Sequence, residues 1–241
     1  MTTWTPPALA SERRPYQHLL WRVVEAQHTA STMRLVDSLD EQGVLETILE
    51  ASKPQLPEAV RSLHYLLGTP FRYRPHAGSR FRAAFEAGVW YGAEELATAL
   101  AEKSYWRQRF LMDSPGTPEL KPVPHTAFRA QVRTRAALDL TRAPFAAQRS
   151  QWNSPVDYAP TQALAAAARA AGVQLIRYES VRDPNHAACA AVLTPALFGR
   201  SKPRGQQTWF IAAGRERVRC ALDERNGASF EFSRAQLAGE A

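Results

Sequence analysis

"GSRFRAAFEAGVWYGAEELATALAE", residues 78–102, shows in one stretch how the chain is built. A glycine-bounded loop carries Arg80, a short apolar run carries Tyr91, and an alanine- and leucine-rich run carries Glu102. The short run is typical of a buried strand, and the run after it has the composition of a helix. A loop, a strand end and the first turns of the next helix can converge on one rim of a sheet. Arg80, Tyr91 and Glu102 are therefore candidates for one shared site.

The residues before this stretch predict helices. Residues 1–15 lack a clear pattern, and we expect them to form a flexible tail. Apolar spacing then predicts one helix from Tyr16, a second that ends at Lys53-Pro54 and a third that ends at Gly68. We expect residues 16–68 to form a helical N-terminal cap that makes a single compact unit with a domain of residues 69–241. Cover for a sheet is the role we favour for this cap, and a homo-oligomer contact or a docking face for a partner are the alternatives.

The residues after Pro70 predict mostly strands. Apolar and polar residues alternate over 126–140, as is typical of a half-buried strand. Two helices interrupt the strands, one that continues to about Phe110 and an alanine-rich one at about Thr161–Ala171. Helices first and strands afterwards indicate an α+β fold with a mixed or antiparallel sheet. The other predicted strands are FRYRP (71–75), VQLIRY (173–178), AACAAVL (187–193), QTWFIAA (207–213), RVRCALD (217–223) and SFEFS (229–233).

The composition narrows the class of partner. A net charge of +7 favours an anionic partner such as nucleic acid, a phosphate-bearing small molecule or an acidic protein. The basic residues are scattered, without a run of five or six, so the charge alone does not decide among these partners, although it favours no direct contact with nucleic acid. Cys189 and Cys220 stand in apolar, strand-like segments, which predicts buried thiols in a reducing compartment. Without a signal-peptide pattern or an apolar run of membrane-spanning length, we expect a cytoplasmic protein that makes no membrane contact.

Several common enzyme motifs are absent from the sequence. Neither of the usual glycine-rich phosphate-binding loops occurs, and there is no G-x-S-x-G nucleophile motif. The histidines stand far apart, and no pair of cysteines has metal-ligand spacing. We therefore expect neither a metal nor a bound cofactor.

Glu102 is the candidate for acid–base or cation-stabilising chemistry. On the predicted helix it lies at the edge of an apolar stripe formed by Leu96, Leu100, Trp106 and Phe110. Partial burial there would favour such a role. The alternative is a solvated glutamate paired with Arg109 or Lys103, and for a lone glutamate that alternative is the commoner case.

Arg80, Tyr91 and Ser180 each have a functional and an ordinary interpretation. The planar guanidinium of Arg80 suits bidentate binding of a diphosphate, but the residue could equally be a surface arginine. Tyr91 could offer its ring to a cationic heterocycle, or could simply fill the core. Ser180 could hold a substrate group, or could start the turn at Asp183-Pro184 through local hydrogen bonds.

Three blocks of the sequence resemble the signature of the RES domain family, which is named for an arginine, a glutamate and a serine. They are GSRF (78–81), VWYGAEELATALAE (89–102) and GVQLIRYESVRD (172–183). In these blocks Arg80, Glu102 and Ser180 match the three named residues, and Tyr91 matches the strand tyrosine. The likeness covers roughly Pro70 to Phe198. Phe81 and Arg82 stand where short toxins of the family usually have a tryptophan and an asparagine.

The resemblance implies both a fold and an activity. Many RES proteins are toxins of bacterial toxin–antitoxin pairs that degrade NAD through a fold similar to ADP-ribosyltransferases, and their usual antitoxin is a helix-turn-helix protein of the Xre type. Residues 69–241 would then be a RES-like catalytic domain, with NAD as substrate and not as cofactor. Catalysis would fall to Glu102, Arg80 and Tyr91, and substrate binding to Arg80, Tyr91 and Ser180.

The residue types fit cleavage of the bond between nicotinamide and ribose. Tyr91 suits the cationic ring, Arg80 suits the diphosphate, and a carboxylate at Glu102 would stabilise an oxocarbenium-like ribose. Water is the default acceptor, with inorganic phosphate or a protein side chain as alternatives. Two other functions stay open: an ADP-ribosyltransferase that modifies a macromolecule, and a non-catalytic basic module that binds nucleic acid or a protein partner.

Overall fold

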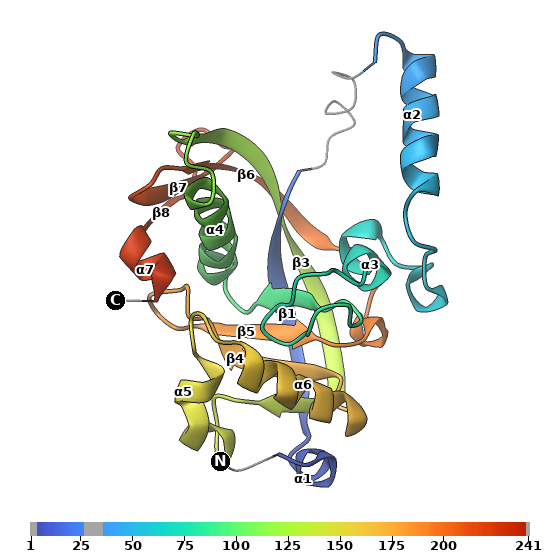
Figure 1. Ribbon diagram of the computed structural model, residues 1–241, viewed down its shortest axis with the longest axis vertical. Helices are drawn as coiled ribbons and strands as arrows, with labels where there is room; N and C mark the ends of the chain where they lie inside the picture. The colour runs from blue at the N-terminus through green and yellow to red at the C-terminus, as the bar shows by residue number, and fades with distance from the viewer. Residues whose placement is uncertain (1–3, 27–35, 240–241) are drawn as a thin grey trace.

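Eight strands form the centre of the molecule (Figure 1). The computed structural model describes residues 4–26 and 36–239. The strands pair in the order β1-β2-β5-β4-β3-β6-β7-β8, and β1 pairs with β3 as well. All pairs are antiparallel except β3 with β4, so the sheet is mixed. The strands are β1 Arg14–Glu25, β2 Trp90–Ala93, β3 Leu120–Asp139, β4 Leu175–Glu179, β5 Ala188–Val192, β6 Arg204–Ala213, β7 Arg217–Leu222 and β8 Ser229–Ser233.

The long strand β3 belongs to two groups of strands. Its first half pairs with β6, from which β7 and β8 continue the sheet. Its last residues, Ala137 to Asp139, pair instead with β4. Because β1 lies along the other edge of β3 and also meets β2 at Trp21 and Ala93, strands β1, β2, β5, β4 and β3 close a ring.

The helix predicted from Tyr16 is wrong, because these residues form β1. The strand pairs with β3 from Arg14 opposite Ala137 to Glu25 opposite His125. Leu20 and Val23 are both buried, although residues three apart point to opposite faces of a strand. Since β1 buries apolar residues on both faces, its pattern lacks the alternation of a half-buried strand and also fits a helix.

The expectation of a flexible tail is wrong for residues 4–15. Helix α1 covers Pro6–Ser11, and its Leu9 is fully buried. The indole of Trp4 donates a hydrogen bond of 2.9 Å to the side chain of Gln148. Burial of Leu9 and the Trp4 bond attach this end to the region of α5 (Arg149–Trp152) and α6 (Ala159–Ala170).

The rest of the predicted cap is helical, and α3 (Tyr65–Arg72) packs on the sheet through Leu66 and Leu67 whereas α2 (Leu39–Ala51) does not. Helix α2 ends where predicted, yet it stands apart from the sheet in Figure 1, and its Val44 and Ile48 are each 60% exposed. A 3-10 helix at Glu58–Val60 and helix α3 follow it. Gly68 does not end α3, and residues 71–75 form no strand. The proposed boundary between a cap and a domain at residue 69 stays a prediction.

The α+β prediction is confirmed. Helix α4 (Leu96–Met112) lies against β1, α7 (Arg234–Ala238) and β6, and its inner face buries Leu100, Ser104, Gln108 and Leu111. The apolar stripe predicted for this helix is wrong in its second half, because Trp106 is 53% and Phe110 62% exposed. Polar Ser104 and Gln108 face inward instead. Gln108 can do so because its amide donates to the carbonyls of Gly214 and Arg215.

Candidate active site

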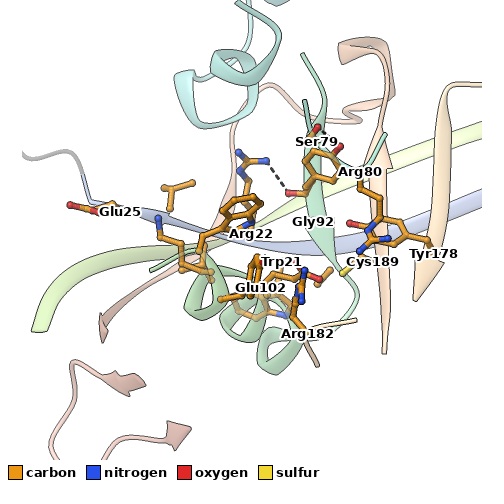
Figure 2. Close-up of a pocket in the computed structure, with 18 of the residues that line it drawn as sticks. Trp21, Arg22, Glu25, Ser79, Arg80, Gly92, Glu102, Tyr178, Arg182 and Cys189 are labelled. Atoms are coloured by element: carbon orange, nitrogen blue, oxygen red, sulfur yellow. Dashed lines mark hydrogen bonds between the residues drawn. The ribbon is translucent and has the colours of Figure 1, made fainter. Parts of the chain in front are cut away.

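A cavity of about 330 Å³ opens between β1, β2 and α4 (Figure 2). It is lined by side chains from strands, the 79–80 loop and α4, so distant parts of the sequence meet at it. Arg80, Tyr91 and Glu102 all line this one cavity, as the sequence predicts. The lining residues are Trp21, Arg22, Val23, Val24, Glu25, Ser79, Arg80, Tyr91, Gly92, Ala93, Ala99, Glu102, Lys103, Tyr105, Trp106, Tyr158, Tyr178, Arg182 and Cys189.

Tyr91 ties strand β2 to the arginine loop. Its hydroxyl accepts a hydrogen bond of 3.1 Å from the backbone N–H of Phe81 and lies 2.8 Å from the hydroxyl of Ser79. Burial raises the pKa of this phenol, so it stays neutral. Because the hydroxyl is held at the loop, the orientation of the ring at the cavity wall is set.

Arg80 is a buried residue and not a surface arginine. It is 8% exposed, and its Nη1 donates 2.8 Å to the backbone carbonyl of Trp152. Its guanidinium also lies over the ring of Tyr158, 4.7 Å from the centroid. These contacts hold the cation at the cavity with one nitrogen engaged. Among the described residues, no other hydrogen-bond partner of the guanidinium is found.

Glu102 is held by Ser180. The Ser180 hydroxyl donates a hydrogen bond of 2.6 Å to the Glu102 carboxylate. The Ser180 hydroxyl oxygen also accepts hydrogen bonds from the backbone N–H groups of Arg182 and Asp183, each at 3.1 Å. The interpretation of Ser180 as a turn residue is therefore confirmed, and in addition its hydroxyl positions the carboxylate. The proposed ion pair of Glu102 with Arg109 is wrong, because Arg109 pairs with Asp113 at 3.0 Å.

Ser180 itself does not line the cavity. It is fully buried behind Glu102, so it reaches the cavity only through the carboxylate. A substrate-binding role for Ser180 stays a prediction. The structure makes it a residue that positions Glu102.

The charge of Glu102 is set by opposing effects. Burial raises the pKa of the carboxyl, while the Ser180 hydrogen bond and the nearby Arg80 and Arg182 act to lower it. The burial effect is the largest, so the carboxyl titrates above its ordinary value. Burial raises the free energy of the ionised carboxylate, so a positive charge placed next to it stabilises it strongly.

The model of the RES domain family matches residues 55–212, which include Arg80, Tyr91, Glu102 and Ser180. The chain belongs to the RES domain family. No curated protein matches it. Among solved structures, a chain of the M. tuberculosis MbcT–MbcA toxin–antitoxin complex aligns with 96% of this chain and 95% of its own length, at 14% sequence identity and a TM-score of 0.47.

The two residues that follow Arg80 have structural roles in this RES domain. Phe81 is fully buried and packs edge-on against Tyr178 at 4.8 Å between ring centroids. Arg82 donates to the backbone carbonyls of Pro75, Ala77 and Ala83. Together they hold the loop that presents Arg80.

Several lining residues of the RES domain are missing from the sequence prediction. Arg182 lies over the ring of Tyr105, 3.6 Å from the centroid, and donates to the carbonyls of Leu237 and Ala238 in α7. Arg182 stands in the YESVRD block (178–183), and this position in the sequence could have indicated that it belongs to the site. Trp21 and Arg22 come from β1, which precedes the matched range. No local signal could reveal them while that segment resembled a helix.

Both thiols are buried, as the sequence predicts. Cys189 lines the cavity, and burial raises its pKa well above the ordinary value. Burial likewise raises the pKa of Cys220 to about 11. Within the part of the chain that the structure describes, no His, Cys, Asp and Glu side chains gather as a metal site, and no helix is long and apolar enough to cross a membrane.

Proposed function

We propose that this RES protein cleaves the bond between nicotinamide and ribose in NAD. The observation that carries the proposal is the shared cavity, in which a buried guanidinium, a tyrosine ring and a buried carboxylate surround one space. Family membership and the residue types support the same reaction. In this proposal Glu102, Arg80 and Tyr91 are the catalytic residues.

Each group answers one feature of the substrate. Nicotinamide in NAD is a cationic ring, and the Tyr91 ring at the wall is suited to face it. The Arg80 guanidinium has free donors for a phosphate oxygen. Glu102 lines the same cavity, and its charge interacts with that of Arg80. In the proposed reaction the oriented carboxylate stabilises the positive charge that develops on the ribose.

The reaction balances with water as acceptor. The bond between ribose C1′ and the ring nitrogen breaks, and its electron pair neutralises the nicotinamide. The oxocarbenium-like ribose is captured by a water oxygen, which loses a proton, to give ADP-ribose. Inorganic phosphate or a protein side chain in the place of water would give a ribosyl phosphate ester or a modified protein. An ADP-ribosyltransferase of this kind would use the same cavity, and the mass of the product separates the three outcomes.

The biological role that we propose is that of a toxin in a toxin–antitoxin pair. The basis is membership of the RES domain family, many of whose members act in such pairs. An Xre-type antitoxin is the corresponding partner. Co-expression with such a protein should restore growth to cells in which this chain depletes NAD.

The decisive experiment measures nicotinamide released from NAD by the purified chain. We expect the parent protein to release it and Glu102→Gln to do so about 10²–10³-fold more slowly, because an amide supplies no charge to the ribose. Glu95→Gln is the matched control, since Glu95 is an exposed glutamate at the start of the same helix and makes no capping bond with its side chain.

Two results would contradict this mechanism. One is a folded parent protein that leaves NAD intact. The other is a Glu102→Gln variant that releases nicotinamide as fast as Glu95→Gln does. Circular dichroism of all three proteins checks that folding is retained.

A further inference from the structure

Two cations line the cavity away from Arg80. Arg22 comes from β1 and Lys103 from α4, and their charges are close enough to affect each other. In the view of Figure 2, Arg22 and Glu25 lie toward one side of the cavity, and Arg80 lies with Tyr178 and Cys189 toward the other. The cavity therefore has a second cationic region, built from elements that do not carry Arg80.

Positive charge exceeds negative charge in this region. Arg107 lies beside Lys103 and pairs with Glu25 at 3.6 Å, and this carboxylate is 60% exposed. Glu25 is the carboxylate that interacts with Lys103 and Arg107. Among the described residues, neither Arg22 nor Lys103 forms an ion pair within 4.0 Å. The three cations are thus accompanied by one exposed carboxylate, which pairs with Arg107.

The hydrogen-bonding capacity of the region is also unfilled. The Nη1 of Arg22 donates 2.9 Å to the backbone carbonyl of Tyr91, and its guanidinium lies over the Trp90 ring at 5.2 Å. Its Nε is buried without a partner among the described residues, as is the Nε of Arg107. Buried donors without partners cost free energy, so native proteins rarely retain them without a reason.

Burial has a cost for these cations too. It lowers the pKa of Arg22 to about 10 and shifts the pKa of Lys103 downward. Both side chains therefore lie in a poorly solvated place. A bound anion would offset that cost, because opposite charges attract most strongly where water is excluded.

We propose that Arg22 and Lys103 form a second anion subsite of the cavity, which binds a phosphate group. The inference rests on the proposed function and deepens it, since a dinucleotide carries two phosphates and Arg80 can face one of them. The phosphate comes either from the dinucleotide or from free inorganic phosphate. In both cases Arg22 and Lys103 contribute binding, while Glu102 contributes to bond cleavage.

Calorimetric titration with pyrophosphate tests the subsite directly. Loss of the ammonium in Lys103→Met should weaken pyrophosphate binding about tenfold, as expected for a hydrogen bond to a charged group. Lys202→Met is the matched control, because Lys202 is exposed on a distant loop and the substitution changes the net charge equally. Lys103 makes no hydrogen bond to the described residues, so its variant should fold.

Further measurements separate the two sources of phosphate, and they separate the anion subsite from the proposed cleavage of NAD. Orthophosphate binding is measured again with the protein saturated by ADP-ribose. If orthophosphate no longer binds, the subsite belongs to the dinucleotide. If it still binds, the subsite takes free phosphate. With NAD as substrate, Lys103→Met should raise KM and leave kcat nearly unchanged, whereas Glu102→Gln lowers kcat.

The subsite is refuted if pyrophosphate fails to bind the parent protein, or if Lys103→Met and Lys202→Met bind it equally. Binding that depends on Lys103 in a protein that leaves NAD intact would refute the proposed reaction and retain the subsite. Arg22→Met, checked by circular dichroism because Arg22 also contacts Tyr91 and Trp90, should weaken binding in the same direction.

Discussion

At the scale of single residues, the bond between Ser180 and Glu102 connects the turn after β4 to the carboxylate on α4. A serine hydroxyl that accepts from two backbone N–H groups has a fixed position, so its proton points at one acceptor. The hydrogen bond favours the charged form of Glu102 against the effect of burial. Ser180 therefore adjusts the pH range in which the carboxylate is ionised.

The pH dependence of nicotinamide release should report this bond. Because the proposed reaction needs ionised Glu102, the rate should fall as pH falls through the raised pKa of that carboxyl. Ser180→Ala removes an effect that lowers this pKa, so the acidic limb of kcat/KM should move to higher pH. Ser104→Ala, which removes another buried serine of the same region, should leave the limb in place. A limb that stays in place in Ser180→Ala would contradict the assignment.

At the scale of elements, the approach of α3 to the chain entering β2 positions Tyr91. Gly88 lies two residues before β2, and a Cβ atom there would overlap the carbonyl oxygen of Pro70 in α3. Trp90 of β2 in turn donates a hydrogen bond to the carbonyl of Leu66. This close backbone contact requires a residue without a side chain at position 88.

We expect Gly88→Ala to lower the free energy of unfolding by about 1–3 kcal/mol, since overfilling a packed site shifts backbone as well as side chains. Gly116→Ala is the control, because a Cβ atom there would meet nothing within 4 Å. Urea denaturation of the two variants measures the difference. Equal stability of both variants would show that the contact can relax without cost.

At the scale of the whole molecule, several arginines behind the net charge of +7 either form ion pairs or line the cavity. Several arginines are paired, such as Arg177 with Glu94 at 2.7 Å and Arg149 with Glu179 at 2.6 Å. Others, including Arg22, Arg80 and Arg182, line the cavity. The arginines of the cavity are therefore placed to bind a small anionic ligand more than an extended one.

A transfer-RNA binding assay tests this distribution. We expect no binding at micromolar protein and about 0.15 M salt, because non-specific binding needs many cations that contact phosphates at once. Binding that is tight at this salt and falls steeply as salt rises would favour the alternative of a basic nucleic-acid module.

Much of the fold and most of the candidate site could be predicted from the sequence. Strands β3 to β8 and helices α4 and α6 follow from local signals, namely alternation, alanine-rich runs and glycine breaks, which short segments carry by themselves. The order and types of Arg80, Tyr91, Glu102 and Ser180 indicated the family, and the first three of them line the cavity. These features need no knowledge of which segments touch.

Tertiary structure alone decided the rest. β1 is a strand because β3 pairs with it from Arg14 to Glu25, and that pairing joins residues a hundred or more positions apart. That pairing makes Arg22 part of the cavity. Other long-range contacts leave Trp106 half exposed at the cavity and bring Ser180 to Glu102 without making Ser180 a lining residue. The free energy of such long-range contacts depends on three-dimensional packing, which overrides local preference where the two differ.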